Sequence, residues 1–331
     1  MSIEYLGLSS VNGPLVVLEG VQDAFFDEIV EFVIDGSERK IGRIVELYED
    51  KAVIQVFEGT ESMSLMNTHT KLTGHPMEIA LSPDMLGRTF NGIGQPIDDL
   101  GPIVSTLKRD VNGLPLNPVC REYPRNYIHT GISAIDGLTT LIRGQKLPIF
   151  SGNGLPHDQL AAQIVKQASL GEDSDEEFAI VFAAMGVKHD VADFFRHTFE
   201  ESGVADHVAM FLNLANDPVV ERLITPKVAL TVAEYLAFEQ HMHILVILTD
   251  MTSFAEAMRE VSSSKGEIPS RKGFPGYLYS ELATIYERAG IVQGVEGSVT
   301  QLPILTMPND DITHPIPDLT GYITEGQIVL D

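Results

Sequence analysis

The sequence is poor in cationic residues, in cysteine and in long apolar runs. Its 331 residues include 22 Lys and Arg against 47 Asp and Glu, for a formal net charge of −25 at pH 7. An acidic surface of this kind repels nucleic-acid phosphates and anionic headgroups, so we expect no nucleic-acid partner. No apolar run approaches 18 residues, which argues against a membrane-spanning helix.

Cysteine is represented only by Cys120, so a disulfide framework is excluded and a reducing compartment is favoured. Residues 1–5 lack the basic start and apolar stretch of a signal peptide, and we therefore expect a cytoplasmic chain. His241 and His243 lie two residues apart at a predicted helix-to-strand junction, and no Cys/His set has ligand spacing. The sequence therefore predicts no metal site.

The first part of the chain alternates apolar and polar residues in short runs separated by turn signals such as Asn12-Gly13 and Asp35-Gly36. Five or six strands at this spacing predict a small closed β-barrel over residues 1–72. The runs lie at 14–18, 28–34, 41–47 and 52–57. Residues 73–125 are rich in Gly and Pro and are predicted to be a connecting region with irregular or strand structure.

From residue 126 onward, apolar strands alternate with helix-patterned segments, which predicts an α/β domain with a mostly parallel sheet over residues 73–331. The strands are expected at 178–184, 208–214, 244–248 and 302–305, with a further strand at 327–331. Asn216, Asp217 and Pro218 provide capping residues and a first-turn proline for a helix over 219–241.

One strand-to-helix turn follows the apolar run 147–150 and precedes a helix-patterned segment that starts at Gln159, which is the position of a phosphate-binding loop. Laid on the pattern G-x-x-x-x-G-K-[ST] from Ser151, it has Pro156 at the second glycine, His157 at the lysine and Asp158 at the hydroxyl. We call it the 151–158 loop, and it comprises Ser151, Gly152, Asn153, Gly154, Leu155, Pro156, His157 and Asp158.

Each substitution in the 151–158 loop removes a specific contact with a nucleotide. Pro156 has no N–H, His157 is mostly neutral at pH 7 and Asp158 repels a γ-phosphate. A lysine–phosphate contact at ~4 Å is worth roughly 4 kcal/mol at a partly buried site, so its loss costs about a thousandfold. We expect neither independent ATPase activity nor a tightly bound cofactor. The alternative is an ordinary Gly-rich turn without any nucleotide role.

Residues 244–249 form an apolar strand that ends in Asp250, as a Walker B strand ends in a carboxylate that holds Mg²⁺. Asp250 could instead be structural, with Ser253 and Glu256 offering a competing helix cap. The position of Asp250 after a degenerate phosphate-binding loop favours a Walker B-like origin.

A cluster of cations precedes a segment with Gly, Pro and two tyrosines at 273–280. A solvated helix face is the ordinary interpretation of such cations. The composition also suits a loop that meets an anionic ligand or a neighbouring subunit. The interface candidates are Arg271, Phe274, Tyr277 and Tyr279.

Several stretches together resemble the non-catalytic B subunits of V/A-type rotary ATPases, in the order of that family from near Tyr5 to Asp331. Gly-Leu-Pro-His at 154–157 separates this family from subunits that resemble intact, lysine-bearing P-loop proteins. The stretches are 57–60, 130–136, 143–148, 151–158, 213–218, 248–252, 275–279 and 314–327.

The resemblance implies a β-barrel, a RecA-like nucleotide-binding α/β domain and a C-terminal helical domain, of which we expect the third to be absent here. It implies three copies alternating with three catalytic A subunits, ATP or ADP at the interface with the catalytic subunit, and central and peripheral stalk subunits as further partners. The complex would couple ATP hydrolysis or synthesis to H⁺ or Na⁺ transport. This chain would be attached to the membrane only through the complex.

The resemblance assigns no catalytic residue to this sequence, because the family's arginine that reaches the ATP site lies in a segment without a counterpart among these residues. The residues themselves leave two alternative functions open. One is a free-standing regulatory or scaffold protein, and the other is an independent P-loop NTPase.

Overall fold

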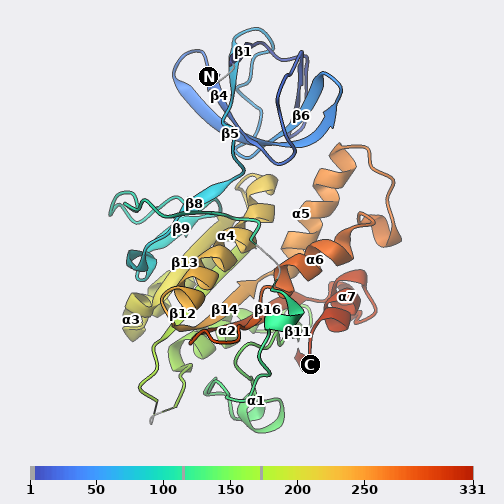
Figure 1. Ribbon diagram of the computed structural model, residues 1–331. Coiled ribbons are helices and arrows are strands. Elements are labelled where there is room, and N and C mark those ends of the chain that lie inside the picture. Colours follow the sequence, from blue (N-terminus) through green and yellow to red (C-terminus); the bar gives the residue numbers. More distant parts are fainter. Residues whose placement is uncertain (1–3, 114–115, 172–173, 331) are drawn as a thin grey trace.

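The computed structural model describes residues 4–113, 116–171 and 174–330. A barrel-like sheet stands above a larger α/β body, with the N-terminus on the barrel and the C-terminus on the α/β body (Figure 1). The predicted fold class, an N-terminal barrel followed by an α/β domain with a mostly parallel sheet, is confirmed.

The barrel-like sheet has seven antiparallel strands in the order β1-β7-β4-β5-β6-β3-β2. Alternation along β4 and β6 places Val30, Phe32 and Ile54 in one buried cluster. The predicted runs correspond to β3, β4, β5 and β6. Strands β1 and β2 are short and exposed, and β7 alternates in burial but its sequence, Thr-His-Thr-Lys-Leu, is mostly polar. The strands are β1 Glu4–Leu6, β2 Ser10–Asn12, β3 Leu15–Glu19, β4 Ile29–Ile34, β5 Glu38–Tyr48, β6 Lys51–Val56 and β7 Thr68–Leu72.

The second sheet has eight strands, ordered β17-β11-β16-β14-β12-β13-β9 with β15 paired antiparallel to β16. The other strand pairs of this sheet, within the described residues, are parallel. The connecting region supplies edge strand β9 and the separate pair β8 and β10. The strands are β8 Glu78–Ala80, β9 Thr89–Asn91, β10 Lys108–Asp110, β11 Ile149–Ser151, β12 Phe178–Val187, β13 Val208–Leu214, β14 His243–Thr249, β15 Gly290–Ile291, β16 Ser298–Thr306 and β17 Ile328–Leu330.

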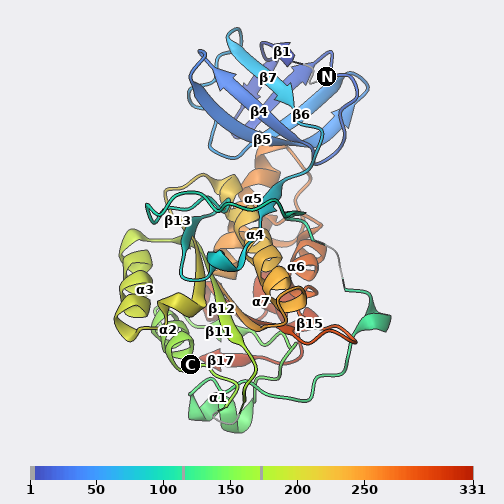
Figure 2. The same ribbon diagram turned by 60° about the vertical axis from the view of Figure 1, so that its left-hand side comes forward.

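Helices cover both faces of this sheet (Figure 2). In β12, Val181 belongs to the buried cluster that contains α4, α5 and α6 side chains, whereas Phe182 belongs to the cluster that contains α2 and α3 side chains. Successive side chains of a strand point to opposite faces. The helices are α1 Ser133–Leu138, α2 His157–Gln167, α3 His189–Ser202, α4 Val219–Phe238, α5 Met251–Ser264, α6 Leu278–Tyr286 and α7 Pro315–Ile323. None of the helices in the described ranges is long and apolar enough to cross a membrane.

Helix α4 starts where predicted, but its cap differs from the prediction. The N-cap residue is Pro218, and no side chain caps the helix. The Asp217 carboxylate instead accepts a hydrogen bond from the Leu214 backbone N–H, 2.7 Å away, and so closes the turn after β13. The helix also ends three residues earlier than predicted, because His241 has a positive φ of 62°.

The first turn of α4 carries a buried carboxylate, Glu221, whose pKa is raised to about 7. Burial is the largest cause, followed by the negative charges of Asp217 and Glu58, the latter from the loop after β6. An unfolded Glu titrates near ~4.3, so between about pH 4 and pH 7 the folded chain binds more protons than the unfolded chain. Stability must therefore fall as pH rises through this interval.

Glu221→Gln is expected to raise the free energy of unfolding at pH 8 by up to about 3 kcal/mol and to change it little at pH 4. Urea denaturation at both pH values measures this. Glu200→Gln, an exposed position on α3, is the matched control and should have no such pH dependence. An equal effect of Glu221→Gln at both pH values would show that the carboxylate charge is not responsible.

Candidate functional site

The 151–158 loop joins β11 to α2 at the edge where the parallel strands end. Ser151 is the last residue of β11, and α2 begins at His157, two residues before the predicted Gln159. Pro156 is the N-cap and makes no side-chain capping hydrogen bond. The two substituted positions that follow Pro156 therefore lie in the first turn of α2, at the positive end of its dipole.

Backbone donors of the 151–158 loop are used inside the chain. The N–H of Asn153 donates to Oδ1 of Asp310 at 2.6 Å. The N–H of Leu155 donates to the Gly152 carbonyl at 3.4 Å, and the N–H of His157 donates to the Leu155 carbonyl at 2.9 Å. The Asp310 carboxylate thus takes the place of an anion at this loop.

The His157 side chain lies back against the loop. Its Nδ1 is 3.1 Å from the Leu155 carbonyl and 3.2 Å from Oγ of Ser151. A carbonyl can only accept, so Nδ1 carries the proton, and Nε2 faces Asp158 Oδ1 at 3.6 Å. The imidazole therefore cannot provide the extended cation that a phosphate-binding lysine provides.

Two carboxylates interact electrostatically at this edge, Asp158 on α2 and Asp250 after β14. Burial raises the pKa of Asp158, His157 opposes the increase and the Asp250 charge adds to it. A bound triphosphate would bring further negative charge to this pair.

Asp250 is tied into the fold by hydrogen bonds. It is the N-cap of α5 and accepts from the Thr252 N–H at 2.8 Å. It also accepts from the N–H and Oγ1 of Thr306, at 3.1 and 2.6 Å, which link the ends of β14 and β16. The predicted competing cap through Ser253 and Glu256 is wrong, because the helix already begins at Met251.

The residues at this edge do not fit a magnesium triphosphate. Three backbone N–H groups of the loop are engaged within the chain, Pro156 has none to offer, and Asp158 and Asp250 already repel each other. The arrangement instead stabilises a strand-loop-helix turn from within the chain.

The interface candidates divide into surface and buried side chains. Tyr277 and Tyr279 are 38% and 47% exposed, whereas Phe274 is 2% exposed. Phe274 packs against His314, with ring centroids 5.7 Å apart, and the Arg259 guanidinium lies 5.4 Å from its ring centroid. The prediction that Phe274 meets a partner is therefore corrected: its side chain belongs to the core.

Arg271 is exposed but has partners within the chain. It donates to the Asp318 carboxylate at 2.9 Å and to the Thr313 carbonyl at 2.7 Å, and so attaches the 271–273 turn to α7. The Tyr277 hydroxyl donates to Glu267 at 2.7 Å. Both side chains therefore have hydrogen-bond partners within the chain.

Asp310 is the residue of this edge that no sequence motif predicted. It lies in the 308–310 turn directly after β16, which pairs in parallel with β11. The parallel order of these two strands, had it been predicted, would have placed residues after 306 beside the 151–158 loop.

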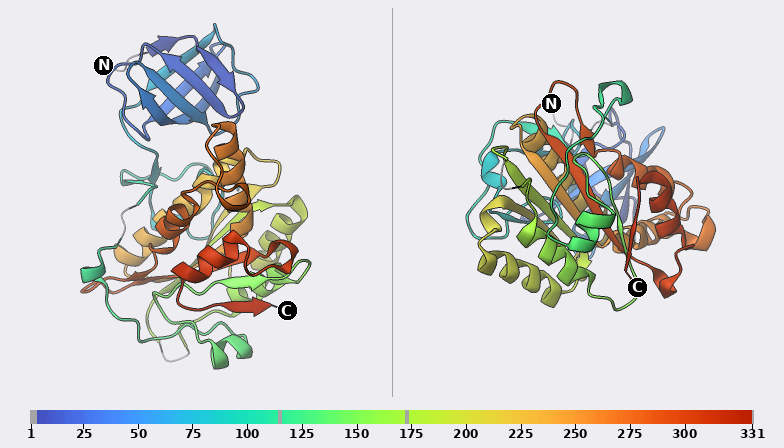
Figure 3. Two further views of the ribbon diagram at one scale, coloured as in Figure 1. Left: turned by 90° about the vertical axis from the view of Figure 1, so that its right-hand side faces the viewer. Right: turned by 90° about the horizontal axis from the view of Figure 1, so that it is seen from below.

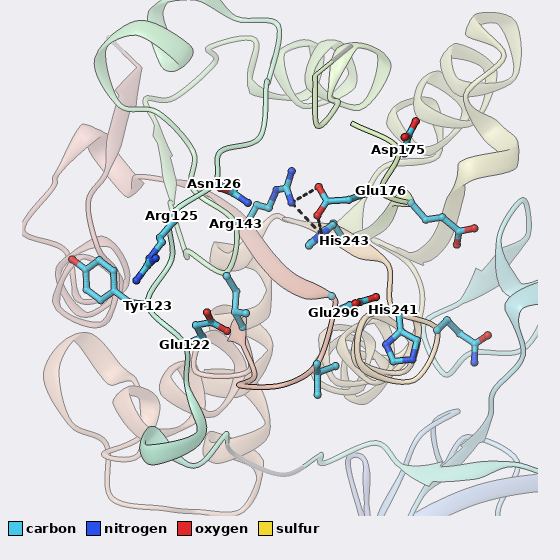
Figure 4. A pocket seen from close by; sticks show the side chains of 15 residues that line it. Glu122, Tyr123, Arg125, Asn126, Arg143, Asp175, Glu176, His241, His243 and Glu296 are labelled. Carbon is cyan, nitrogen blue, oxygen red and sulfur yellow. Dashed lines mark hydrogen bonds and ion pairs between the residues drawn. The ribbon is translucent and has the colours of Figure 1, made fainter. Parts of the chain in front are cut away.

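A hollow of about 740 Å³ lies at the other edge of the sheet from the 151–158 loop, where β12, β14 and β16 begin (Figure 4). Buried Arg143 donates to Glu176 at 2.7 Å and to His243 Nε2 at 3.1 Å. His243 Nδ1 lies 2.8 Å from Ser298 Oγ. These residues come from four separate segments, so no local sequence motif indicates a site here.

Ser298, His243 and Glu176 have the composition of a nucleophilic triad, but burial excludes that role. His243 Nε2 lies 3.1 Å from Arg143 Nη1, which can only donate, and 3.3 Å from Glu176 Oε1, which accepts. Ser298 is fully buried, so its hydroxyl cannot reach a substrate. The cluster joins the starts of the central strands.

Comparison with known proteins matches two domains of one family in chain order. The beta-barrel domain of the ATP synthase alpha/beta family matches residues 8–74, and its nucleotide-binding domain matches residues 131–331. The chain is 66% identical to V-type ATP synthase beta chain 2 of Clostridium tetani (strain Massachusetts / E88), over 100% of this chain and 72% of that protein.

Two further relatives are V-type ATP synthase beta chains. The protein of Halothermothrix orenii is 64% identical over 99% of this chain and 70% of its own length. The protein of Thermotoga neapolitana is 59% identical over 99% of this chain and 71% of its own length. The chain therefore belongs to the ATP synthase alpha/beta family and is a homologue of its V-type ATP synthase beta chains.

Proposed function

We propose that this chain is the non-catalytic B subunit of a V/A-type rotary ATPase. It would alternate with catalytic A subunits in a ring and couple ATP hydrolysis or synthesis to H⁺ or Na⁺ transport. Similarity to V-type ATP synthase beta chains over 99–100% of this chain supports the assignment to the complex. The non-catalytic role rests on the 151–158 loop.

The observation that carries the non-catalytic role is the hydrogen bond from the Asn153 N–H to Asp310. It places a carboxylate of the chain against a loop that, in a working P-loop, would hold phosphate. ATP or ADP would instead lie at the interface with the catalytic subunit, where this chain would form one wall. Arg271, Tyr277 and Tyr279 are the surface candidates for that wall.

The other two functions have less support. An independent P-loop NTPase would need the phosphate contacts that Pro156, His157 and Asp158 do not provide. A free-standing scaffold is not favoured, because the similarity to V-type ATP synthase beta chains covers 99–100% of the chain. Central and peripheral stalk subunits would be further partners. The chain would be attached to the membrane only through the complex.

Gel filtration with a V-type catalytic subunit tests the proposed function. We expect the chain to elute with the catalytic subunit in a complex larger than either alone. Separate elution at micromolar concentrations of both chains, with and without ATP and Mg²⁺, would contradict assembly and would favour the scaffold.

Tyr277→Ala is expected to reduce assembly or ATP turnover of the ring while the isolated chain stays folded, because the exposed ring would be lost from the proposed interface. Tyr277→Phe keeps the ring and removes the bond to Glu267. Tyr123→Ala, an exposed tyrosine at the opposite edge, is the matched control. Wild-type turnover of rings that carry Tyr277→Ala would remove Tyr277 from the interface.

A further inference from the structure

The barrel meets the α/β domain at residues 57–60, the loop that follows β6, which we call the barrel loop. Figure 3 shows α4 and α5 beneath the barrel. Phe57 is fully buried and belongs to the same cluster as Val220 and Ile224 in the first turns of α4. The barrel loop therefore carries an apolar side chain into the core of the α/β domain.

Two carboxylates lie at this contact, Glu58 next to Phe57 and Glu221 in the first turn of α4. Glu221 is 7% exposed. The charged groups that act on it are the carboxylates of Asp217, which precedes α4, and of Glu58, which belongs to the barrel. Within the described ranges no ion pair neutralises Glu221, so burial and its negative neighbours both disfavour its charged form.

The other groups around Glu221 do not compensate its charge. The 91–94 turn lies close to it, since a Cβ at Gly92 would be 3.3 Å from Oε2 of Glu221, and this turn has no titratable side chain. Arg222, the next residue of α4, donates to Oδ1 of Asn213 at 2.9 Å and to two backbone carbonyls at the end of β13. Its guanidinium is therefore engaged elsewhere.

On the barrel side, Glu58 is bound to β5. Its Oε2 accepts from the Ile41 N–H at 3.3 Å, and Lys40 donates to a carbonyl of the barrel loop at 2.9 Å. Burial is the largest cause that raises the pKa of Glu58, and the Glu38 charge adds to it. The Ile41 hydrogen bond and the Lys40 charge oppose this increase of the pKa. Glu58 therefore has contacts that stabilise its charged form, which Glu221 lacks.

We propose that Glu58 and Glu221 form a proton-operated contact between the barrel and the α/β domain. When Glu221 is protonated, it does not repel the charge of Glu58, and Phe57 stays in its cluster. When both carboxylates are ionised, they repel each other across the boundary, and the barrel loop separates from α4 so that water reaches Glu221. The contact lies within one chain, so it requires neither the 151–158 loop nor assembly into a ring.

The pKa of Glu221 in the closed and the open contact sets the direction of the pH dependence. In the closed contact this pKa is raised to about 7, chiefly by burial. A solvated Glu titrates at ~4.3, so proton binding favours the closed contact. This stabilisation is fully present below about pH 4 and is lost as the pH rises to about 7. Between pH 6 and pH 8 we expect the equilibrium constant for opening to increase about tenfold.

Hydrogen exchange of the isolated chain in a series from pH 5 to pH 8, measured by mass spectrometry and corrected for intrinsic exchange rates, tests the proposal. The reporters are the amides of Ile41 and Phe57, because Phe57 donates to the Ile41 carbonyl at 2.9 Å and Ile41 donates to Glu58. We expect their protection to fall about tenfold from pH 6 to pH 8. It should also be lower than that of β12 throughout, because the contact opens without global unfolding.

Glu221→Gln should abolish this pH dependence, whereas Glu200→Gln, at an exposed position on α3, should leave it unchanged. Glu58→Gln should lower the pH at which protection falls, because it removes one cause of the raised pKa of Glu221. It also provides the test if Glu221→Gln does not fold by circular dichroism.

The proposal is overturned if the reporter amides of the wild-type chain are equally protected at pH 6 and pH 8. It is also overturned if folded Glu221→Gln keeps the wild-type pH dependence, or if Glu58→Gln leaves the midpoint of the change where it is in the wild type. Protection of the reporter amides equal to that of β12 would overturn it as well, since the barrel loop would then open only when the whole chain unfolds.

Discussion

The isolated chain is expected to show no steady-state ATP turnover, and His157→Lys alone is expected not to create it. A lysine at 157 would restore a cation, but Pro156 would still lack an N–H and the Asn153 N–H would still donate to Asp310. Asp158 and Asp250 would also still oppose a triphosphate. Phosphate release by a preparation free of catalytic subunit measures this.

A graded series identifies which feature blocks nucleotide binding. Pro156→Gly, His157→Lys and Asp158→Thr together restore the second glycine, the lysine and the hydroxyl of the P-loop pattern, with Ser151 still at the first glycine. Asp310→Ala then frees the Asn153 N–H. We expect measurable affinity for magnesium ATP only when all four changes are combined. Turnover of the unmodified chain near the ~10 s⁻¹ of ordinary enzymes would contradict the non-catalytic role.

Apolar periodicity was sufficient to predict the central strands and the fold class. The predicted strand at 208–214 coincides with β13, and those at 178–184 and 244–248 are shorter than β12 and β14 by a few residues at their ends. These strands are buried on both faces, so they are continuous apolar runs that a sequence shows directly.

The helix starts were harder to predict, because capping depends on backbone geometry that several residues of one segment could provide. Asp217 and Ser253 had suitable side chains for caps, yet Pro218 and Asp250 occupy those positions. Phe274 was misassigned for a related reason: its Gly- and Pro-rich surroundings indicate a surface loop, while its ring packs inward against His314.

Contacts between distant segments account for what local patterns could not predict at the site. Asp310 lies 157 positions from Asn153 along the chain, and Thr306 lies 56 positions from Asp250. Only the order of strands β11, β16 and β14 in the sheet brings these pairs together. The sequence thus predicted which groups the 151–158 loop lacks, but not the carboxylate that replaces the anion.

The second large effect is expected at Asp250, where Ala should lower the free energy of unfolding by about 2–4 kcal/mol. The change removes the cap of α5 and both hydrogen bonds from Thr306. Asp250→Asn retains one acceptor oxygen and should have a smaller effect. Urea denaturation at pH 8 measures the difference.

Asp158→Asn is the matched variant, because it removes the other carboxylate of this edge without removing a cap. The folded pKa of Asp158 is raised, chiefly by burial, so its charged form destabilises the chain above the unfolded pKa and its protonated form does not. Asp158→Asn should therefore increase stability at pH 8 and change it little at acid pH. The prediction is wrong if Asp250→Asn and Asp158→Asn lower the free energy of unfolding equally at pH 8. Asp158 would then make stabilising contacts as strong as those of Asp250. Opposite signs would show that this edge keeps one carboxylate for its hydrogen bonds and carries the other at a cost.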